Sequence, residues 1–162
     1  MKRLTKPGLF AYALAALVIV LDQLSKYWIL KILVLPSRDS VPVIGPVRLT
    51  MVWNKGVSFG LLRADIDLTR WALAAFSIAV AIFLAVWARN VTRRIAAVAL
   101  GLLIGGAIGN VIDRIARGAV VDFISLHWHR AYTFPAFNLA DSAITLGAIC
   151  LLLDELLRVR RG

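Results

Sequence analysis

Four apolar runs, each of about 20 residues, constrain this chain more than any other feature of its sequence. They cover about residues 8–30, 68–88, 95–112 and 137–157. A helix needs about 20 mostly apolar residues to cross the hydrocarbon core of a bilayer, so each run predicts a transmembrane helix. The chain is 60% hydrophobic, which is more than a soluble domain of this length requires. We expect one mainly α-helical membrane domain, residues 1–162, built as a bundle of four transmembrane helices.

Basic residues gather in three groups beside these runs, and they predict the orientation of the chain. With four spans, both termini and the middle connection lie on one side, and clustered Lys and Arg mark that side as cytoplasmic. The groups are Lys2, Arg3 and Lys6; Arg89, Arg93 and Arg94; and Arg158, Arg160 and Arg161. The net charge of +10 does not indicate nucleic-acid binding, because zinc-type spacings and basic stripes interleaved with aromatics are both missing from the sequence.

The two outer connections, residues 31–67 and 113–136, contain extended segments. Val47–Trp53 alternates apolar and polar residues, as a half-buried strand does, and Asn54–Gly56 then reads as a turn. Ala119–Ile124 reads as a second extended segment. We expect a small β-sheet on the outer surface of the membrane.

Ionisable and amide side chains at the ends of the spans point to function, because such groups are costly near hydrocarbon. Asp22 and Lys26 are four residues apart and therefore share a helical face, which favours an ion pair. Asp113 beside Arg114 is interpreted as an orienting or structural pair. Asn110 and Asp113 are three apart, as are Asn138 and Asp141, so each pair also shares a face. All of these polar groups lie near the same end of their helices: Asp22, Lys26, Asn110, Asp113, Arg114, Asn138 and Asp141.

Asp122 and Asp141 differ from the other acids, because neither has a basic residue within one helical turn. Two neighbouring carboxyl groups share one proton, which supplies an acid and a base side by side at neutral pH. Such a pair activates water against a peptide bond. It also suits a proton- or ion-coupled transporter, although transporters place their acids near the bilayer midplane and often carry repeats. A non-enzymatic scaffold is the third reading.

Other candidate groups are interpreted structurally. His127 and His129 have the spacing of two metal ligands, but no third ligand is evident in the sequence, so we expect no metal site. Ser125 has no base at triad-like spacing. Cys150 lies in an apolar run and is expected to be a small buried hydrophobe. Gly101, Gly105 and Gly109 predict close helix packing.

Five segments along nearly the whole chain, taken in order, resemble the lipoprotein signal peptidase family, the bacterial signal peptidases II. They are DQLSK at 22–26, NKGVSFG at 54–60, GGAIGNVIDR at 105–114, VDF at 121–123 and FNLAD at 137–141. The resemblance implies a membrane aspartic endopeptidase with four transmembrane helices and a small extracytoplasmic sheet. It implies an inner-membrane enzyme that removes the signal peptides of prolipoproteins, cutting before a cysteine that carries diacylglycerol.

The same resemblance assigns roles to residues. The catalytic dyad falls on Asp122 and Asp141, with the active site towards the outer face. The supporting or substrate-binding positions fall on Asp22, Lys26, Asn54, Gly56, Asn110, Asp113, Arg114 and Asn138. The expected partners are diacylglyceryl prolipoproteins and membrane lipids. We expect a monomer that needs no metal or cofactor and binds no nucleic acid.

Overall fold

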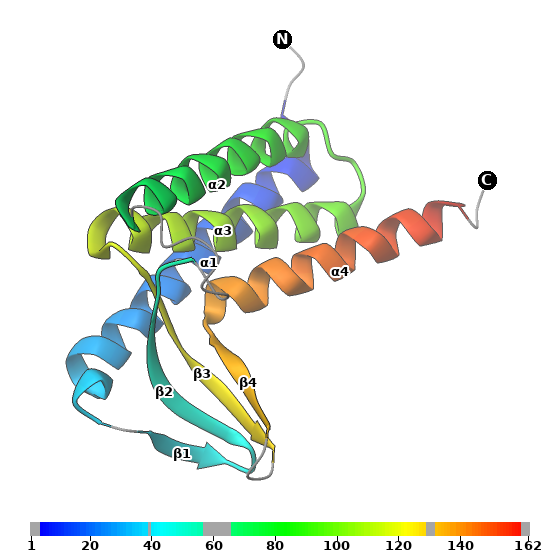
Figure 1. Cartoon of the computed structure of the whole chain (residues 1–162). Coiled ribbons are helices and arrows are strands. Elements are labelled where there is room, and N and C mark those ends of the chain that lie inside the picture. The colour runs from blue at the N-terminus through cyan, green and yellow to red at the C-terminus, as the bar shows by residue number, and fades with distance from the viewer. Residues whose placement is uncertain (1–3, 39, 57–65, 129–131, 160–162) are drawn as a thin grey trace.

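The structure is a computed structural model, and it describes residues 4–38, 40–56, 66–128 and 132–159. Helix α1 (Lys6–Tyr27) continues as a π-helical turn, η1 (Trp28–Ile32), and a short 3-10 helix, η2 (Leu35–Ser37), follows. Next come strands β1 (Val41–Ile44) and β2 (Val47–Asn54), helices α2 (Ile66–Ala88) and α3 (Arg94–Arg117), strands β3 (Val120–Trp128) and β4 (Tyr132–Phe137), and helix α4 (Leu139–Val159). The sheet lies at one end of the helices (Figure 1).

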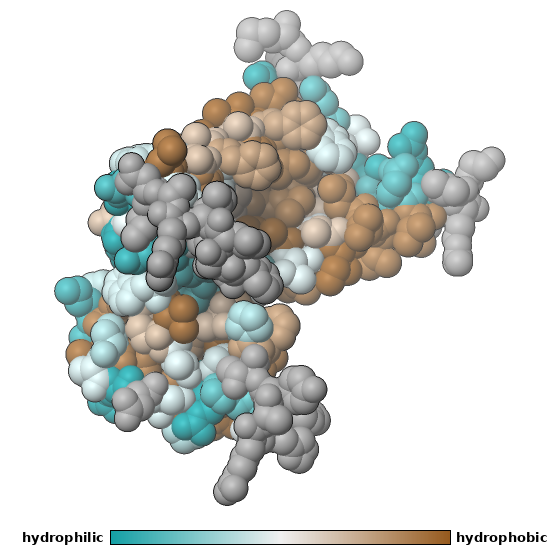
Figure 2. All heavy atoms as spheres, in the orientation of Figure 1, coloured by the Kyte–Doolittle hydropathy of each residue, from teal (hydrophilic) through white to brown (hydrophobic). Residues whose placement is uncertain are grey.

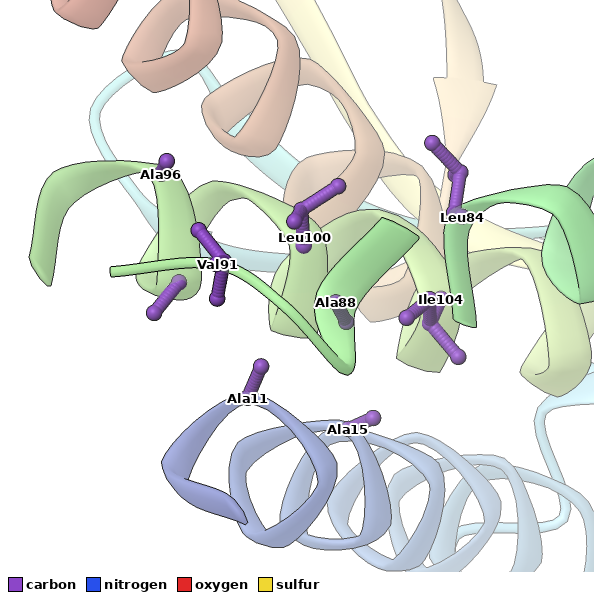
Figure 3. Close-up of a cluster of buried hydrophobic side chains, with 9 residues drawn as sticks. Ala11, Ala15, Leu84, Ala88, Val91, Ala96, Leu100 and Ile104 are labelled. Carbon is purple, nitrogen blue, oxygen red and sulfur yellow. The ribbon is translucent and has the colours of Figure 1, made fainter. Parts of the chain in front are cut away.

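Helix α3 is the central helix, because α1, α2 and α4 all pack against it. Its glycines make this packing close: a Cβ atom at Gly105 would lie 2.8 Å from the Ala15 carbonyl oxygen, and one at Gly106 would lie 2.5 Å from that of Ala140. The predicted role of the glycine face is therefore confirmed. Small side chains from α1, α2 and α3 fill the seam between these helices, as Figure 3 shows for Ala11, Ala15 and Ala88.

The outer faces of the helices remain apolar, which is the reverse of a soluble bundle. Figure 2 shows hydrophobic atoms over the helices and hydrophilic atoms at their ends. Within the described residues, three helical segments are long and apolar enough to cross a membrane: Lys6–Ile32, Asp67–Ala88 and Arg94–Arg117. They correspond to the first three predicted spans. Helix α4 occupies the fourth predicted run, but it carries the charged residues Asp141, Asp154, Glu155 and Arg158 and is not one of these three segments.

The sheet has four antiparallel strands in the order β1-β2-β3-β4. The expected strands at Val47–Trp53 and Ala119–Ile124 are present as β2 and β3. Strands β1 and β4 were not predicted, because Pro42 and Pro135 interrupt segments that lack a clear alternation. A cluster made by Ile29, Leu35, Val121 and Phe123 packs η1 and η2 against β3.

Helix α3 is longer than predicted, and this changes the setting of two candidate residues. The expected span ended near residue 112, whereas the helix runs to Arg117 and ends at Gly118, whose φ of 80° suits glycine. Asp113 and Arg114 therefore lie inside the helix rather than in a loop. Asp113 is fully buried there.

Candidate active site

The predicted polar residues meet where the sheet joins the helices. Strands β2 and β3 bring Asn54 and Asp122, while α3 brings Asn110 and the first turn of α4 brings Asp141. Side-chain hydrogen bonds connect all four of these residues through Asn138, the residue between β4 and α4. The structure thus gathers the sequence-predicted residues into one cluster.

Asp122 lies near the start of β3 and is only 1% exposed. Its Oδ2 accepts a hydrogen bond from the Asn54 amide at 2.9 Å, and its Oδ1 accepts one from the Asn138 amide at 2.7 Å. Burial raises the pKa of Asp122 to about 6, and the negative charge of Asp141 adds to this rise, whereas the two amide hydrogen bonds oppose it. A carboxyl group with such a pKa exchanges its proton near neutral pH.

A β-bulge sets Asn54 and Asp122 on the same face of the sheet. Asp122 lies opposite Val52 and Asn54 lies opposite Val120, so the two polar residues are diagonal neighbours. The register shifts between Leu49 and Val52, because β2 has one residue more than β3 over this stretch. A bulge of this kind changes which side chains share a face, and bulges are common beside active sites.

Gly56 fixes the orientation of the Asn54 amide. The Gly56 N–H donates to Asn54 Oδ1 at 2.8 Å, which leaves the Asn54 NH₂ group free to face Asp122. Gly56 has a φ of +89°, and an added Cβ atom would contact the end of the Leu73 side chain. The backbone conformation therefore favours glycine here. The rest of the predicted motif, residues 57–60, lies outside the described residues.

Asp141 and Asn138 form a reciprocal cap at the start of α4. Asn138 Oδ1 accepts from the Asp141 N–H at 2.9 Å, and Asp141 Oδ2 accepts from the Asn138 N–H at 3.2 Å. This is a capping box with Asp in the third helical position. Asp141 is half-buried, so its carboxylate is held in place by the helix start and remains reachable.

Asn110 connects the two predicted catalytic carboxylates. Its NH₂ group donates to Asp141 Oδ1 at 2.8 Å, and its Oδ1 accepts from the Asn138 amide at 3.2 Å. The second NH₂ hydrogen bond of Asn138 reaches Asp122, so two amides join one carboxylate to the other. Lys26 Nζ also lies 3.4 Å from Asn110 Oδ1.

A buried ion cluster lies directly behind the carboxylate pair. Lys26 is fully buried, and its Nζ lies 2.7 Å from Asp22 Oδ2 and 2.8 Å from Asp113 Oδ2. The predicted Asp22–Lys26 ion pair is therefore present. Each acid also holds one backbone N–H of the active site: Asp22 Oδ1 accepts from Ala140 at 3.0 Å, and Asp113 Oδ2 accepts from Val121 at 3.0 Å. These two N–H groups immediately precede Asp141 and Asp122, so the cluster positions both.

The predicted pairing of Asp113 with Arg114 is wrong. Asp113 pairs with Lys26 and with Arg117, whose Nη1 lies 2.5 Å from Asp113 Oδ1. Arg117 is four residues after Asp113 and so shares its helical face, whereas the adjacent Arg114 points elsewhere and donates to the Asn110 carbonyl at 3.4 Å. Gln23 was not predicted as a site residue. Its amide NH₂ group donates hydrogen bonds to Asp22 and Asp113, and its amide oxygen accepts one from Arg117. The spacing of Asp113 and Arg117 was the available signal.

The alternative candidates are placed away from this cluster. His127 Nε2 lies 3.2 Å from Ser125 Oγ, which gives Ser125 a partner that its sequence spacing did not suggest. Ser125 is 2% exposed and also bonds Thr50 and the Arg48 carbonyl, as a structural hydroxyl does. His129 lies outside the described residues. Among those described, no three His, Cys, Asp or Glu side chains are grouped as metal ligands.

Two grooves open beside the carboxylate pair. One, of about 570 Å³, runs between β4 and α4; it has Asp141 in its wall and is otherwise lined mainly by apolar side chains, including Leu126, Phe134 and Leu146. The other, of about 260 Å³, runs between α2, α3 and α4 and includes Asn110 and Arg114. The site therefore combines a hydrogen-bonded acid pair with two neighbouring grooves that are lined mainly by apolar side chains.

The chain matches known proteins over nearly its whole length. Residues 14–157 match the family model described as signal peptidase (SPase) II. It is 54% identical to a lipoprotein signal peptidase of Caulobacter vibrioides over 155 residues, which cover 95% of this chain and 90% of that protein. It is 41% identical to a lipoprotein signal peptidase of Burkholderia cenocepacia over 167 aligned positions, with 98% and 97% coverage.

Solved structures agree with the sequence match. A bacterial membrane enzyme solved by the in meso method at 2.3 Å superimposes with a TM-score of 0.80 at 30% identity, over 100% of this chain and 96% of the other. A second, solved by the same method at 1.9 Å, gives a TM-score of 0.75 at 29% identity, over 96% and 97%. With this shared fold and the matched sequence, the chain belongs to the signal peptidase II family of bacterial membrane proteases.

Proposed function

We propose that Asp122 and Asp141 are the catalytic dyad of a membrane aspartic endopeptidase that removes signal peptides from prolipoproteins, cutting before a diacylglyceryl cysteine. One observation carries the assignment: both carboxylates accept hydrogen bonds from asparagine amides, and Asn110 and Asn138 join them. Among the described residues, Asp122 and Asp141 are the two acids without a cation within ion-pair distance, and Asp141 also lines a groove.

The dyad works with one proton between its two carboxyl groups. The ionised carboxylate takes a proton from water as the water oxygen attacks the scissile carbonyl carbon, and the protonated carboxyl donates to the carbonyl oxygen. When the C–N bond breaks, the dyad passes its proton to the leaving amine of the cysteine and takes one back from a hydroxyl of the tetrahedral intermediate. The products are a signal peptide with a new carboxylate and a lipoprotein with a free amino end.

The surrounding residues hold the dyad rather than react. Asn54, Asn110 and Asn138 aim N–H donors at the carboxylates, while Asp22, Lys26 and Asp113 fix the backbone on which the dyad stands. Gly56 keeps the Asn54 amide in its orientation. Arg114 lines the groove beside Asn110, where it is placed to bind a substrate carbonyl or a lipid ester oxygen.

The two apolar grooves suit the two apolar parts of the substrate. A lipidated cysteine brings acyl chains, and the signal peptide brings an apolar helix, so both leave the scissile bond at the membrane surface between them. Contacts with these remote parts position the bond for attack.

The test uses purified protein in detergent and a prolipoprotein with or without diacylglycerol on its cysteine. We expect the parent to cut only the lipidated substrate, and we expect Asp122→Asn and Asp141→Asn each to lower kcat by at least about 10³-fold, since each removes half of the acid–base pair. Cleavage is followed by gel shift.

The matched control is Asp67→Asn, which makes the same change at a residue whose side chain is 75% exposed near the start of α2. Its rate should equal that of the parent. Folded dyad variants that still cut at the parental rate would show that the catalytic assignment is wrong. Equal cleavage of the unmodified substrate would leave the dyad intact but remove the lipid requirement.

A further inference from the structure

A large groove lies at the end of the helices opposite the dyad. It has a volume of about 610 Å³ and runs between the first turns of α1 and α3. Its lining residues are Lys6, Pro7, Phe10, Arg94, Ala97 and Val98. None of them takes part in the proposed peptidase site, so this groove needs a separate explanation.

The residues that line the groove change from charged to apolar with depth, as residues at a membrane boundary do. Lys6 and Arg94 are the first residues of two membrane-spanning segments, so both lie at the same edge of the apolar region. Phe10 and Val98 each lie four residues further along the same helices, about 6 Å deeper at 1.5 Å per residue, and on the same helical faces. Each wall is therefore cationic at its mouth and apolar below.

Among the described residues, neither of the two cations at the mouth has an acidic partner. At this end of the molecule Arg93 lies 2.8 Å from Asp154, and Arg158 lies 3.2 Å from Glu155. Within residues 4–38, 40–56, 66–128 and 132–159, neither Lys6 nor Arg94 has a carboxylate within ion-pair distance. Both side chains are exposed, so the groove presents two uncompensated positive charges.

The walls of the groove are held in place. The Thr5 N–H donates to the Arg89 carbonyl at 3.2 Å, and the Thr5 hydroxyl donates to the Val91 carbonyl at 2.5 Å. A Cβ atom at Gly8 would clash with the Ala88 carbonyl oxygen, so the backbones of α1 and the end of α2 are in contact. These contacts tie the start of α1 to the connection that leads into α3, and the groove is preformed.

We propose that this groove binds an anionic phospholipid, with the phosphate between Lys6 and Arg94 and one acyl chain against Phe10, Ala97 and Val98. Positive charge at the membrane surface attracts anionic headgroups, and basic pockets between transmembrane helices hold them. The apolar depth below the cations distinguishes a lipid from a free phosphate ion, which has nothing to place there. The site lies outside the peptidase cluster, so the proposal goes beyond the proposed function.

The experiment is native mass spectrometry of the full-length protein in detergent, titrated with dioleoylphosphatidylglycerol or dioleoylphosphatidylcholine. We expect the parent to retain the anionic lipid with at least about tenfold higher affinity than the zwitterionic one. The double variant Lys6→Gln/Arg94→Gln should lose this preference. The matched control, Arg89→Gln/Arg158→Gln, removes the same charge from the same end outside the groove and should keep it.

A third variant distinguishes lipid binding in the groove from non-specific electrostatic attraction to the basic surface. Val98→Trp leaves every charge in place and fills the apolar part, so we expect the affinity for the anionic lipid to fall about tenfold or more. Inorganic phosphate at the same concentration should not displace the lipid. Retention of the lipid by both groove variants at parental affinity, or equal affinity of the parent for the two lipids, would overturn the proposal. Prolipoprotein cleavage by each variant reports that the protein is folded and tests the peptidase assignment separately.

Discussion

Three asparagines shape the dyad by using one end of each amide as an anchor. The Oδ1 atoms of Asn54 and Asn138 accept from the backbone N–H groups of Gly56 and Asp141, and that of Asn110 accepts from Asn138 and Lys26. Each NH₂ group is thereby turned towards a carboxylate. Fixed donors of this kind stabilise negative charge on the dyad without reorganising during the reaction.

Burial and the amide donors act in opposite directions on Asp122. Its pKa rises from 3.8 to about 6, because burial and the charge of Asp141 outweigh the hydrogen bonds from Asn54 and Asn138. The Asp122 carboxyl group therefore keeps its proton up to about pH 6. Since the mechanism needs one proton on the pair, kcat/KM should fall about tenfold per pH unit above the upper apparent pKa of the dyad, near 6. A pH profile of prolipoprotein cleavage measures it.

Stability gives an independent readout of the same shift. A folded-state pKa above the unfolded value means that the folded protein binds more protons between about pH 4 and pH 6, so the unfolding free energy decreases as pH rises through that window. The decrease should be smaller in Asp122→Asn, which has no proton to lose at this position. Thermal unfolding in detergent at pH 4, 5, 6 and 7 compares the two proteins. Identical pH dependence would contradict a raised pKa at Asp122.

At the residue scale the sequence predicted the members of the cluster better than their partners. Asp22, Lys26, Asn110 and Asp141 stand out because polar groups at the ends of apolar runs are rare. Arg114 was predicted as the partner of Asp113 because the two are adjacent in the sequence, but adjacent side chains on a helix point about 100° apart. Only the three-dimensional packing shows that Lys26 from α1 reaches Asp113 on α3.

At the element scale, Asn138 at the start of α4 has two structural roles. Asn138 caps the helix through its Oδ1 and reaches Asp122 through its NH₂ group. The variants Asn138→Ala and Asn138→Ser separate these roles, because serine keeps a capping acceptor but has no amide. We expect Asn138→Ala to lose about 1–2 kcal/mol of unfolding free energy and Asn138→Ser to recover about 1 kcal/mol of it. Thermal or denaturant unfolding in detergent measures this difference.

Activity should respond differently from stability in the same pair. Both variants lose the N–H donor to Asp122, so both should cut the lipidated prolipoprotein about 10- to 100-fold more slowly than the parent. A serine variant with full activity would mean that Asn138 contributes only the helix cap.

The predictability of the elements follows from their local signals. The long helices follow from apolar length, and β2 follows from its alternation, because both patterns persist over many residues. Strands β1 and β4 depend on pairing with β2 and β3, and each includes a proline that weakens its local preference. The bulge in β2 is equally invisible locally, although it decides that Asn54 and Asp122 share a face.

At the scale of the whole molecule, the two ends of the helices have opposite roles. The sheet and the dyad lie at one end, and the connection between α2 and α3 lies at the other, where Arg93 pairs with Asp154 of α4 (Figure 1). This arrangement supports our proposal that α4 is a fourth span. Its 21 residues extend about 32 Å, which matches the hydrocarbon thickness. Near the end of α4, Asp154 is buried and paired with Arg93. The neighbouring Leu152, Leu153 and Leu156 are exposed and available for contact with lipid.

A cysteine-accessibility experiment tests this topology. The native Cys150 is first replaced by serine, and single cysteines are then placed by Ile44→Cys in β1, Asn90→Cys after α2, and Arg158→Cys near the end of α4; all three positions are exposed. With the dyad towards the outer face, a membrane-impermeant maleimide should label only Ile44→Cys in intact spheroplasts. Asn90→Cys and Arg158→Cys should react only after permeabilisation, because we expect the clustered basic residues to place that end in the cytoplasm. Labelling of Arg158→Cys from outside would mean that α4 does not cross the membrane, and labelling of Asn90→Cys from outside would mean that the orientation is reversed.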